Sequence, residues 1–262
     1  QSSAIDVSVS KTGDPSQQRR GAAVCWKLDS EATTEWRGWA DVNFVTSARC
    51  LYADTTDAMV EVDSCVTPQG QRLIAVFNTA DASDHTLSRA MPESTQAWGS
   101  STTVVSTGRG PSTIFALDDD RVIVLDTRGS DKPIAMVSED GSGDSWETYS
   151  ESPFPVLPAG TPARAKARHA NEQVMCWIQN STTLLQYASS DLGATYTLLD
   201  SFANTHSFGL TTTPAGTFVF AYIDGSANKI YVKRFGSAYQ AFDNTSTIEV
   251  ADVTATTKAY EI

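Results

Sequence analysis

The strongest constraint on the fold is a short apolar run that recurs about every 50 residues. Four such runs, each preceded by a polar turn, begin at Leu73, Val122, Val174 and Phe218, so successive starts lie 49, 52 and 44 residues apart. A fixed period of this length indicates that one supersecondary unit is repeated along the chain.

A second landmark follows each run by about two dozen residues and ends in an aromatic side chain. These aromatics are Trp98, Trp146, Tyr196 and Tyr239, spaced by 48, 50 and 43 residues. Because the two landmarks keep parallel spacings, they belong to one repeating unit. A period of roughly 40 to 50 residues is typical of a four-stranded β-propeller blade.

The composition of the segments indicates an all-β chain. The apolar runs are short, rich in β-branched and aromatic residues, and separated by Gly, Pro, Asn or Asp, and no long stretch keeps a helical period. The segment 20–42, which contains Trp36 and Trp39, supplies a further unit. We therefore predict an all-β β-propeller of about five four-stranded antiparallel blades. It forms one domain over 1–262, with candidate blades at about 15–48, 59–104, 112–157, 163–202 and 207–250.

The ends of the chain offer a closing strand for this arrangement. Either Ile5–Val9 or Ile248–Val253 could complete a blade that is shared between the two ends, because an open propeller leaves an unpaired strand edge.

Two of the aromatic landmarks sit in a more specific motif, Ser-x-Asp-x-Gly-x-Thr-aromatic. One copy consists of Ser189, Asp191, Gly193, Thr195 and Tyr196; the other, with one inserted residue and Ser for Thr, of Ser138, Asp140, Gly143 and Trp146. The pattern suits a tight hairpin: the carboxylate accepts backbone N–H groups, Gly supplies a positive φ, and the aromatic packs inward. The segments that end at Trp98 and Tyr239 keep the aromatic but lack the Asp.

These two motifs resemble the Asp-boxes of the sialidase-like, or BNR-repeat, β-propellers. The resemblance implies that they are structural and peripheral, so they predict architecture rather than activity. A catalytic member would carry an Arg-Ile-Pro segment, three carboxylate-binding arginines, a Tyr and Glu pair and an acid/base Asp. The Arg-Ile-Pro segment is absent and no arginine trio stands out. We predict no catalytic residues, with a glycan-acting hydrolase of the sialidase type as an alternative.

One segment departs from the acidic character of the chain. Arg164, Lys166 and Arg168 alternate with Ala, so a strand here places all three on one face. In the phase of the repeat, this is the innermost strand of a blade, which lines the central channel. The row predicts a binding site for a carboxylate, sulfate or phosphate group, including an anionic glycan. The alternative is that the three side chains pair with acids such as Glu61 or Asp63.

Overall charge and residue spacing exclude other partners. A formal net charge of -12 argues against nucleic-acid binding, and no apolar run is long enough for membrane insertion. Three histidines in different repeats and four cysteines without zinc spacing predict no metal and no cofactor. Cys50 and Cys65 bracket a short segment and form either a disulfide or two reduced thiols.

These features favour a non-catalytic recognition or assembly module of an extracellular, cell-surface or virion structure, such as a phage tail or capsid. Its partner would be a protein or a surface glycan, with a homo-oligomer or virion assembly as a further possibility. A secreted lectin is the remaining alternative.

Overall fold

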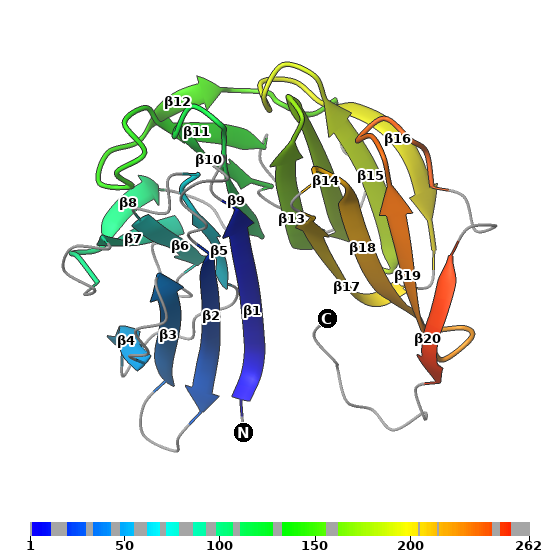
Figure 1. Cartoon of the computed structure of the whole chain (residues 1–262), viewed down its shortest axis with the longest axis horizontal. Helices are drawn as coiled ribbons and strands as arrows, with labels where there is room; N and C mark the ends of the chain where they lie inside the picture. The colour runs from blue at the N-terminus through cyan, green and yellow to red at the C-terminus, as the bar shows by residue number, and fades with distance from the viewer. Residues whose placement is uncertain are drawn as a thin grey trace. The chain divides into compact units, whose positions relative to one another are not determined.

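The described part of the chain contains twenty β-strands and no helix (Figure 1). The computed structural model describes residues 2–11, 20–29, 34–42, 48–54, 62–68, 72–78, 86–92, 98–106, 111–127, 133–155, 162–203, 205–213, 215–242 and 247–252, with side-chain surroundings from residue 63 onward. The strands form five four-stranded sheets, each a meander of four consecutive antiparallel strands. The predicted all-β fold of about five four-stranded blades is confirmed.

Three sheets belong to a compact unit that spans Gln1–Glu151. Sheet 1 contains β1 (Ser2–Lys11), β2 (Arg20–Asp29), β3 (Thr34–Val42) and β4 (Ala48–Asp54). Sheet 2 contains β5 (Val62–Val66), β6 (Arg72–Asn78), β7 (Thr86–Pro92) and β8 (Thr102–Val105). Sheet 3 contains β9 (Ser112–Ala116), β10 (Val122–Asp126), β11 (Ile134–Ser138) and β12 (Glu147–Ser150).

Two sheets belong to a second compact unit, Ser152–Ile262. Sheet 4 contains β13 (Pro162–Ala170), β14 (Gln173–Asn180), β15 (Thr183–Ser189) and β16 (Thr197–Phe202). Sheet 5 contains β17 (Thr205–Thr212), β18 (Phe218–Asp224), β19 (Lys229–Phe235) and β20 (Ile248–Asp252). The prediction of a single domain over 1–262 stays a prediction.

The two end segments do not form a blade shared between the ends of the chain, as one prediction had it; each pairs with its neighbour in sequence. Ile5–Val9 lies in β1, where Ile5 pairs with Trp26 of β2, so this segment is the first strand of sheet 1. Ile248 begins β20, which pairs with β19 and completes sheet 5. Sheet 1 therefore starts at Ser2 rather than near residue 15. Pairing with the sequence neighbour closes a shorter loop and so costs less chain entropy than pairing with the far end.

The apolar runs that mark the repeat form the second strand of their sheets, namely β6, β10, β14 and β18. In β10, Val122, Ile123, Val124 and Leu125 are all 0% exposed. Both faces of this strand are buried, which explains why the sequence reads as a continuous apolar run instead of an alternating one.

Successive sheets pack face to face within each unit. In the first unit, Ile74 and Val76 of sheet 2 share a core with Ile114, Val122 and Val124 of sheet 3. In the second unit the core is aromatic, and Trp177 of sheet 4 stacks on Phe220 of sheet 5 at 4.2 Å between ring centroids.

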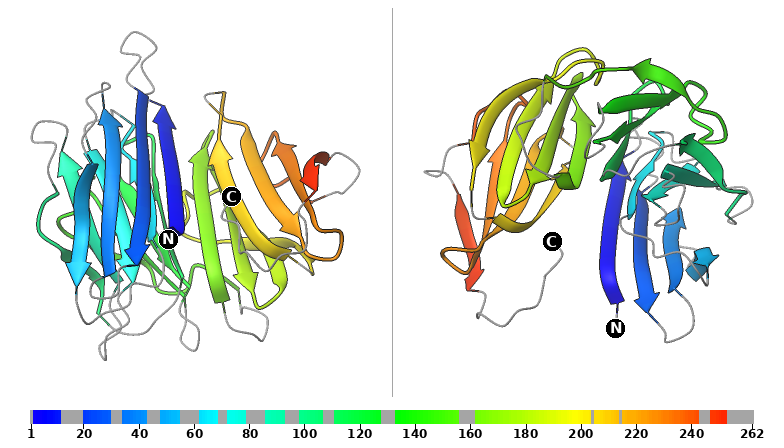
Figure 2. Two further views of the ribbon diagram at one scale, coloured as in Figure 1. Left: turned by 90° about the horizontal axis from the view of Figure 1, so that it is seen from below. Right: turned by 180° about the vertical axis from the view of Figure 1, so that it is seen from behind.

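The first strands of neighbouring sheets lie beside one another in each unit. β5 contacts both β1 and β9, and β13 contacts β17 (Figures 1 and 2). Side-by-side first strands are the arrangement expected of the innermost strands of neighbouring blades.

None of the described residues form a helix that could cross a membrane.

The structure also bears on the cysteine that was considered for a disulfide. Cys65 is buried and is not part of a disulfide, so the predicted alternative of a disulfide with Cys50 is wrong. The buried position of Cys65 in the core between sheets 2 and 3 explains why it behaves as a small apolar residue.

Candidate functional site

The basic row lies on β13, the first strand of sheet 4. Arg164, Lys166 and Arg168 are partly exposed, whereas the intervening Ala165 and Ala167 are 0% exposed. The alternation follows from the period of two in a β-strand, and alanine fills the buried face because little space is left there. The strand therefore brings the three basic side chains to one face.

Arg164 reaches from sheet 4 to the neighbouring sheet 5. Its Nη1 donates a 2.7 Å hydrogen bond to Oγ of Ser207, on β17. Ser207 is 2% exposed, so this oxygen is a fixed, buried acceptor. The contact ties the first strands of two adjacent sheets together at the basic row.

The other members of the row are also held by the protein. Nη1 of Arg168 donates a 2.7 Å hydrogen bond to the carbonyl oxygen of Ala167, and all three basic residues make further interactions. Of the acids that could pair with them, Glu61 lies outside the described residues. Asp63 is fully buried, and its Oδ2 accepts hydrogen bonds from Thr113 Oγ1 at 2.5 Å and from Ile114 N at 3.1 Å.

The first predicted box forms the turn between β11 and β12. Oδ1 of Asp140 accepts hydrogen bonds from Ser142 N at 2.9 Å and from Ser138 Oγ at 3.2 Å, and Ser138 Oγ accepts one from Gly143 N at 3.0 Å. The backbone hydrogen bond from Ser142 is the main reason that the pKa of Asp140 lies below its ordinary value.

Glycine is required in this turn for two reasons. Gly143 has a φ of 72°, and a Cβ at this position would lie 3.1 Å from Cγ2 of Ile74, in sheet 2. The turn also docks on sheet 2 through Trp146, whose Nε1 donates to Ser88 Oγ at 2.8 Å. The predicted aromatic is thus a contact between neighbouring sheets.

The second predicted box forms the turn between β15 and β16. Asp191 accepts hydrogen bonds from Thr195 N at 2.9 Å, Thr195 Oγ1 at 2.6 Å and Ser189 Oγ at 2.7 Å. Burial alone would raise the pKa of Asp191, but the hydrogen bonds from Thr195 and Ser189 together lower it. Gly193 has a φ of 94° and donates its N–H to Ser189 Oγ at 2.9 Å.

Tyr196, the aromatic of this second turn, packs inward as predicted. It is 5% exposed and stacks on Phe154 at 4.6 Å between centroids, and its N–H donates to the carbonyl oxygen of Pro153 at 2.7 Å. The turn is therefore anchored on the segment that precedes sheet 4.

The turn of sheet 5 lacks the Asp and uses a different acceptor. Oε1 of Gln173, on β14, accepts hydrogen bonds from Ser237 Oγ at 2.8 Å and from Ala238 N at 2.9 Å. Tyr239 is 40% exposed, so the aromatic of this turn does not pack inward. Ala238, which is 0% exposed, takes the inward position in its place.

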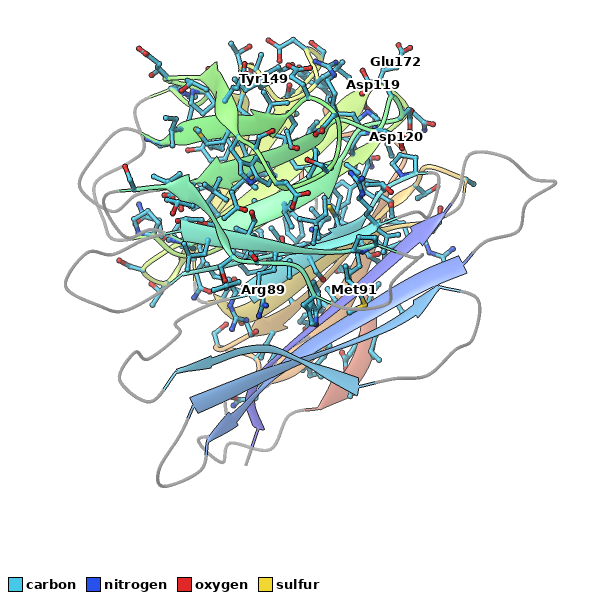
Figure 3. The ribbon with its side chains drawn as sticks, turned by 90° about the vertical axis from the view of Figure 1, so that its left-hand side faces the viewer. Arg89, Met91, Asp119, Asp120, Tyr149 and Glu172 are labelled. Atoms are coloured by element: carbon cyan, nitrogen blue, oxygen red, sulfur yellow. The ribbon has the colours of Figure 1, made fainter. Side chains whose placement is uncertain are left out.

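The acidic run of the first unit is a turn. Asp118, Asp119 and Asp120 connect β9 to β10, and Figure 3 labels Asp119 and Asp120 there. Nε of Arg121 donates to Oδ2 of Asp119 at 2.8 Å. Among the residues with described surroundings, no group of three or more His, Cys, Asp or Glu is placed to hold a metal ion.

Sequence reasoning missed Ser207 and Gln173. Ser207 stands 43 residues after Arg164, close to the repeat spacing, so aligning the first strands of the two sheets would have pointed to it. Gln173 carries no such signal, because it belongs to a different sheet from the turn that it holds.

Comparisons with known proteins show the fold. No protein-family model and no curated protein matches the sequence. A protein of unknown function from Dyadobacter fermentans superposes with a TM-score of 0.66 at 10% identity, over 95% of this chain and 83% of that one. The SapL1 lectin, solved in complex with alpha methyl fucoside, gives a TM-score of 0.58 at 10% identity, over 94% of this chain and 82% of the lectin.

A leech intramolecular trans-sialidase, solved in complex with 2,7-anhydro-Neu5Ac, is also similar. Its TM-score is 0.58 at 9% identity, and the match covers 95% of this chain but only 60% of the sialidase. Identities this low carry information about fold alone. The chain has the fold of the sialidase-like β-propellers.

Proposed function

We propose that the chain is a non-catalytic β-propeller that binds an anionic glycan through Arg164, Lys166 and Arg168. The observation that carries the proposal is the alternation along β13, which gathers three cationic side chains on one face of a chain with a net charge of -12. Charged hydrogen bonds from arginine and lysine are the usual means of binding carboxylates and sulfates.

The similar structures support a glycan as the partner. One is a lectin solved with a fucoside, and another is a trans-sialidase solved with a sialic-acid derivative. The absence of an Arg-Ile-Pro segment favours binding without cleavage. An extracellular, cell-surface or virion location suits such a binding module and belongs to the same proposal.

We also assign the turns at Asp140 and Asp191 to the Asp-box type. In both, a Ser hydroxyl and an Asp carboxylate accept backbone N–H groups, and a Gly with positive φ follows. In this assignment the two turns stabilise the blades and take no part in ligand binding.

A glycan array tests the function directly. The purified chain should bind acidic glycans in preference to neutral ones, and Arg164→Ala should lose about tenfold or more in apparent affinity. Arg234→Ala is the matched control, because Arg234 is an exposed arginine on β19 of the same unit. Equal loss in both variants would show that general charge, not the row, attracts the glycan.

Mass analysis of the retained glycans separates binding from cleavage. Unchanged glycans are expected, whereas a cleaved product would favour the hydrolase alternative. Binding of neutral glycans only, with no effect of Arg164→Ala, would favour a lectin whose site lies elsewhere. If the protein binds no glycan on the array, a glycan partner is contradicted and the assembly alternative is favoured.

A further inference from the structure

Two polar atoms lie inside the aromatic core between sheets 4 and 5 without a hydrogen bond. Trp177 on β14 and Gln186 on β15 are both 0% exposed. Among the described residues, neither Nε1 of Trp177 nor Oε1 of Gln186 has a hydrogen-bond partner. Buried polar atoms are hydrogen-bonded in the great majority of cases, so a donor and an acceptor in one core require an explanation.

The two residues are direct neighbours in sheet 4. Trp177 pairs with Gln186 in the ladder of β14 and β15, so the two side chains leave the sheet on the same face, with Cβ atoms about 5 Å apart. This face packs on sheet 5, because the ring of Trp177 stacks on that of Phe220 at 4.2 Å between centroids. The core therefore receives one N–H donor and one C=O acceptor at the same place along the ladder.

The orientation of the Gln186 amide is fixed by the segment that follows β19. Its Nε2 donates a 2.7 Å hydrogen bond to the carbonyl oxygen of Gln240. Turning the amide over would place Oε1 against that carbonyl oxygen, and two acceptors repel each other. Oε1 therefore remains the buried acceptor.

The aromatic rings around Trp177 do not satisfy both atoms. Phe202 and Phe242 meet the indole in T-shaped contacts, at 5.7 Å and 6.1 Å between centroids. The face of a ring is a weak acceptor for an N–H group, but a phenyl ring has no N–H or O–H to donate to the amide oxygen. A group that serves both atoms needs a lone pair and a polar hydrogen.

We infer that Trp177 and Gln186 form a binding site for a single water molecule buried between sheets 4 and 5. The water accepts a hydrogen bond from Nε1–H of Trp177 and donates one to Oε1 of Gln186. Waters in protein interiors characteristically bridge two to four polar groups that the protein itself leaves open. This site adds a polar bridge between β14 and β15 to an aromatic interface, and it does not depend on the proposed glycan binding.

Water-selective NMR spectroscopy of the wild-type protein tests the donor side. The indole signal of Trp177 is assigned from its nuclear Overhauser contacts to Phe220, the ring on which it stacks. The indole N–H should then show a cross-peak to a long-lived water molecule. A dry contact with the face of a Phe ring would instead give no water cross-peak and an N–H resonance shifted upfield.

Oxygen-17 relaxation dispersion tests the acceptor side, because it counts long-lived waters. Gln186→Met keeps the length of the side chain but removes the acceptor, so the count should fall by about one water per molecule. Gln173→Met is the matched control. Gln173 also holds the segment after β19, but its Oε1 already accepts from Ser237 and Ala238, so this variant should keep the wild-type count.

Two results would overturn the inference. An unchanged count in Gln186→Met, or an equal loss in both Gln variants, would show that Oε1 of Gln186 holds no water of its own. The absence of a water cross-peak at the Trp177 indole would exclude the bridge from the donor side, and that measurement requires no substitution in the core.

Discussion

The carboxylate of Asp140 shows how one residue organises a turn of this protein. It is an exposed side chain, yet it accepts a backbone N–H and a hydroxyl and so joins the two ends of the β11–β12 connection. An exposed acid in such a turn stabilises by local hydrogen bonding rather than by pairing with a distant charge.

We expect Asp140→Ala to lower the free energy of unfolding by about 1 kcal/mol at neutral pH, because two hydrogen bonds are lost at a solvent-exposed site. The folded-state pKa lies below the ordinary value of 3.8, so the ionised form is favoured in the folded state. The contribution is therefore present above about pH 4 and disappears as the pH falls through the folded-state pKa.

Urea titrations at several pH values measure this effect. The difference between wild type and Asp140→Ala should shrink as the pH falls below about 4, when the carboxyl group becomes protonated. Glu147→Gln, at an exposed position on β12, is the control and should change stability by less than about 0.5 kcal/mol. A difference that grows on acidification would contradict the stated role of Asp140.

At the scale of elements, the turns between the third and fourth strands of sheets 3 and 5 each connect their sheet to the one before it. Trp146 of sheet 3 bonds to Ser88 of sheet 2, and the turn of sheet 5 bonds to Gln173 of sheet 4. The same place in the repeat thus makes a contact between sheets even where the local sequence has diverged.

Trp146→Phe tests the first of these contacts. It removes the indole N–H and should cost about 1 kcal/mol, because Ser88 Oγ loses a buried partner. In a double-mutant cycle with Ser88→Ala, the two effects should be less than additive. Full additivity would show that the Nε1 to Oγ hydrogen bond contributes nothing to stability.

Gln173→Ala tests the second contact. The backbone N–H of Ala238 loses its acceptor, so its hydrogen exchange should accelerate by about fivefold if the bond contributes about 1 kcal/mol. Hydrogen exchange read by NMR measures this at a single amide. Glu172→Gln, at the exposed neighbouring residue, should leave the rate unchanged.

At the scale of the whole molecule, each compact unit has its own hydrophobic core and its own buried thiol. Cys65 lies in the first unit and Cys176 in the second, and both are buried and outside any disulfide. Buried thiols react with alkylating reagents only when the surrounding structure opens. The two cysteines can therefore report the unfolding of the two units separately.

Pulsed alkylation in increasing urea, followed by peptide mass analysis, should find Cys65 and Cys176 protected in native conditions and labelled as their unit unfolds. Labelling of either thiol without denaturant would contradict the burial seen in the structure.

Much of the architecture could be predicted from the sequence. The second strands of sheets 2, 3 and 4 are buried on both faces, so their apolar runs recur with the period of the blade and mark these sheets. The Ser, Asp and Gly residues of the turns act within a few residues of one another, which makes their role readable from local sequence. The alternation of Arg164, Lys166 and Arg168 with alanine is local in the same way.

The surroundings of single side chains in the folded protein could not be predicted in this way. Lys233 is 1% exposed, and its ammonium lies 5.0 Å from the ring centroid of Phe242, although nothing in the sequence marks a buried lysine on β19. The sequence likewise leaves open whether Ile5–Val9 or Ile248–Val253 closes a shared blade, because a strand at the end of a chain fits either partner.

The all-β class, the blade period and the shared strand face of the basic row can be read from the sequence, because each depends on periodicity or on neighbours within a few residues. The folded chain was needed to show that Arg164 bonds to Ser207, that Gln173 replaces the missing Asp, and that β1 begins its own sheet. These features join residues that are dozens of positions apart, and the energy of such contacts depends on how whole sheets pack.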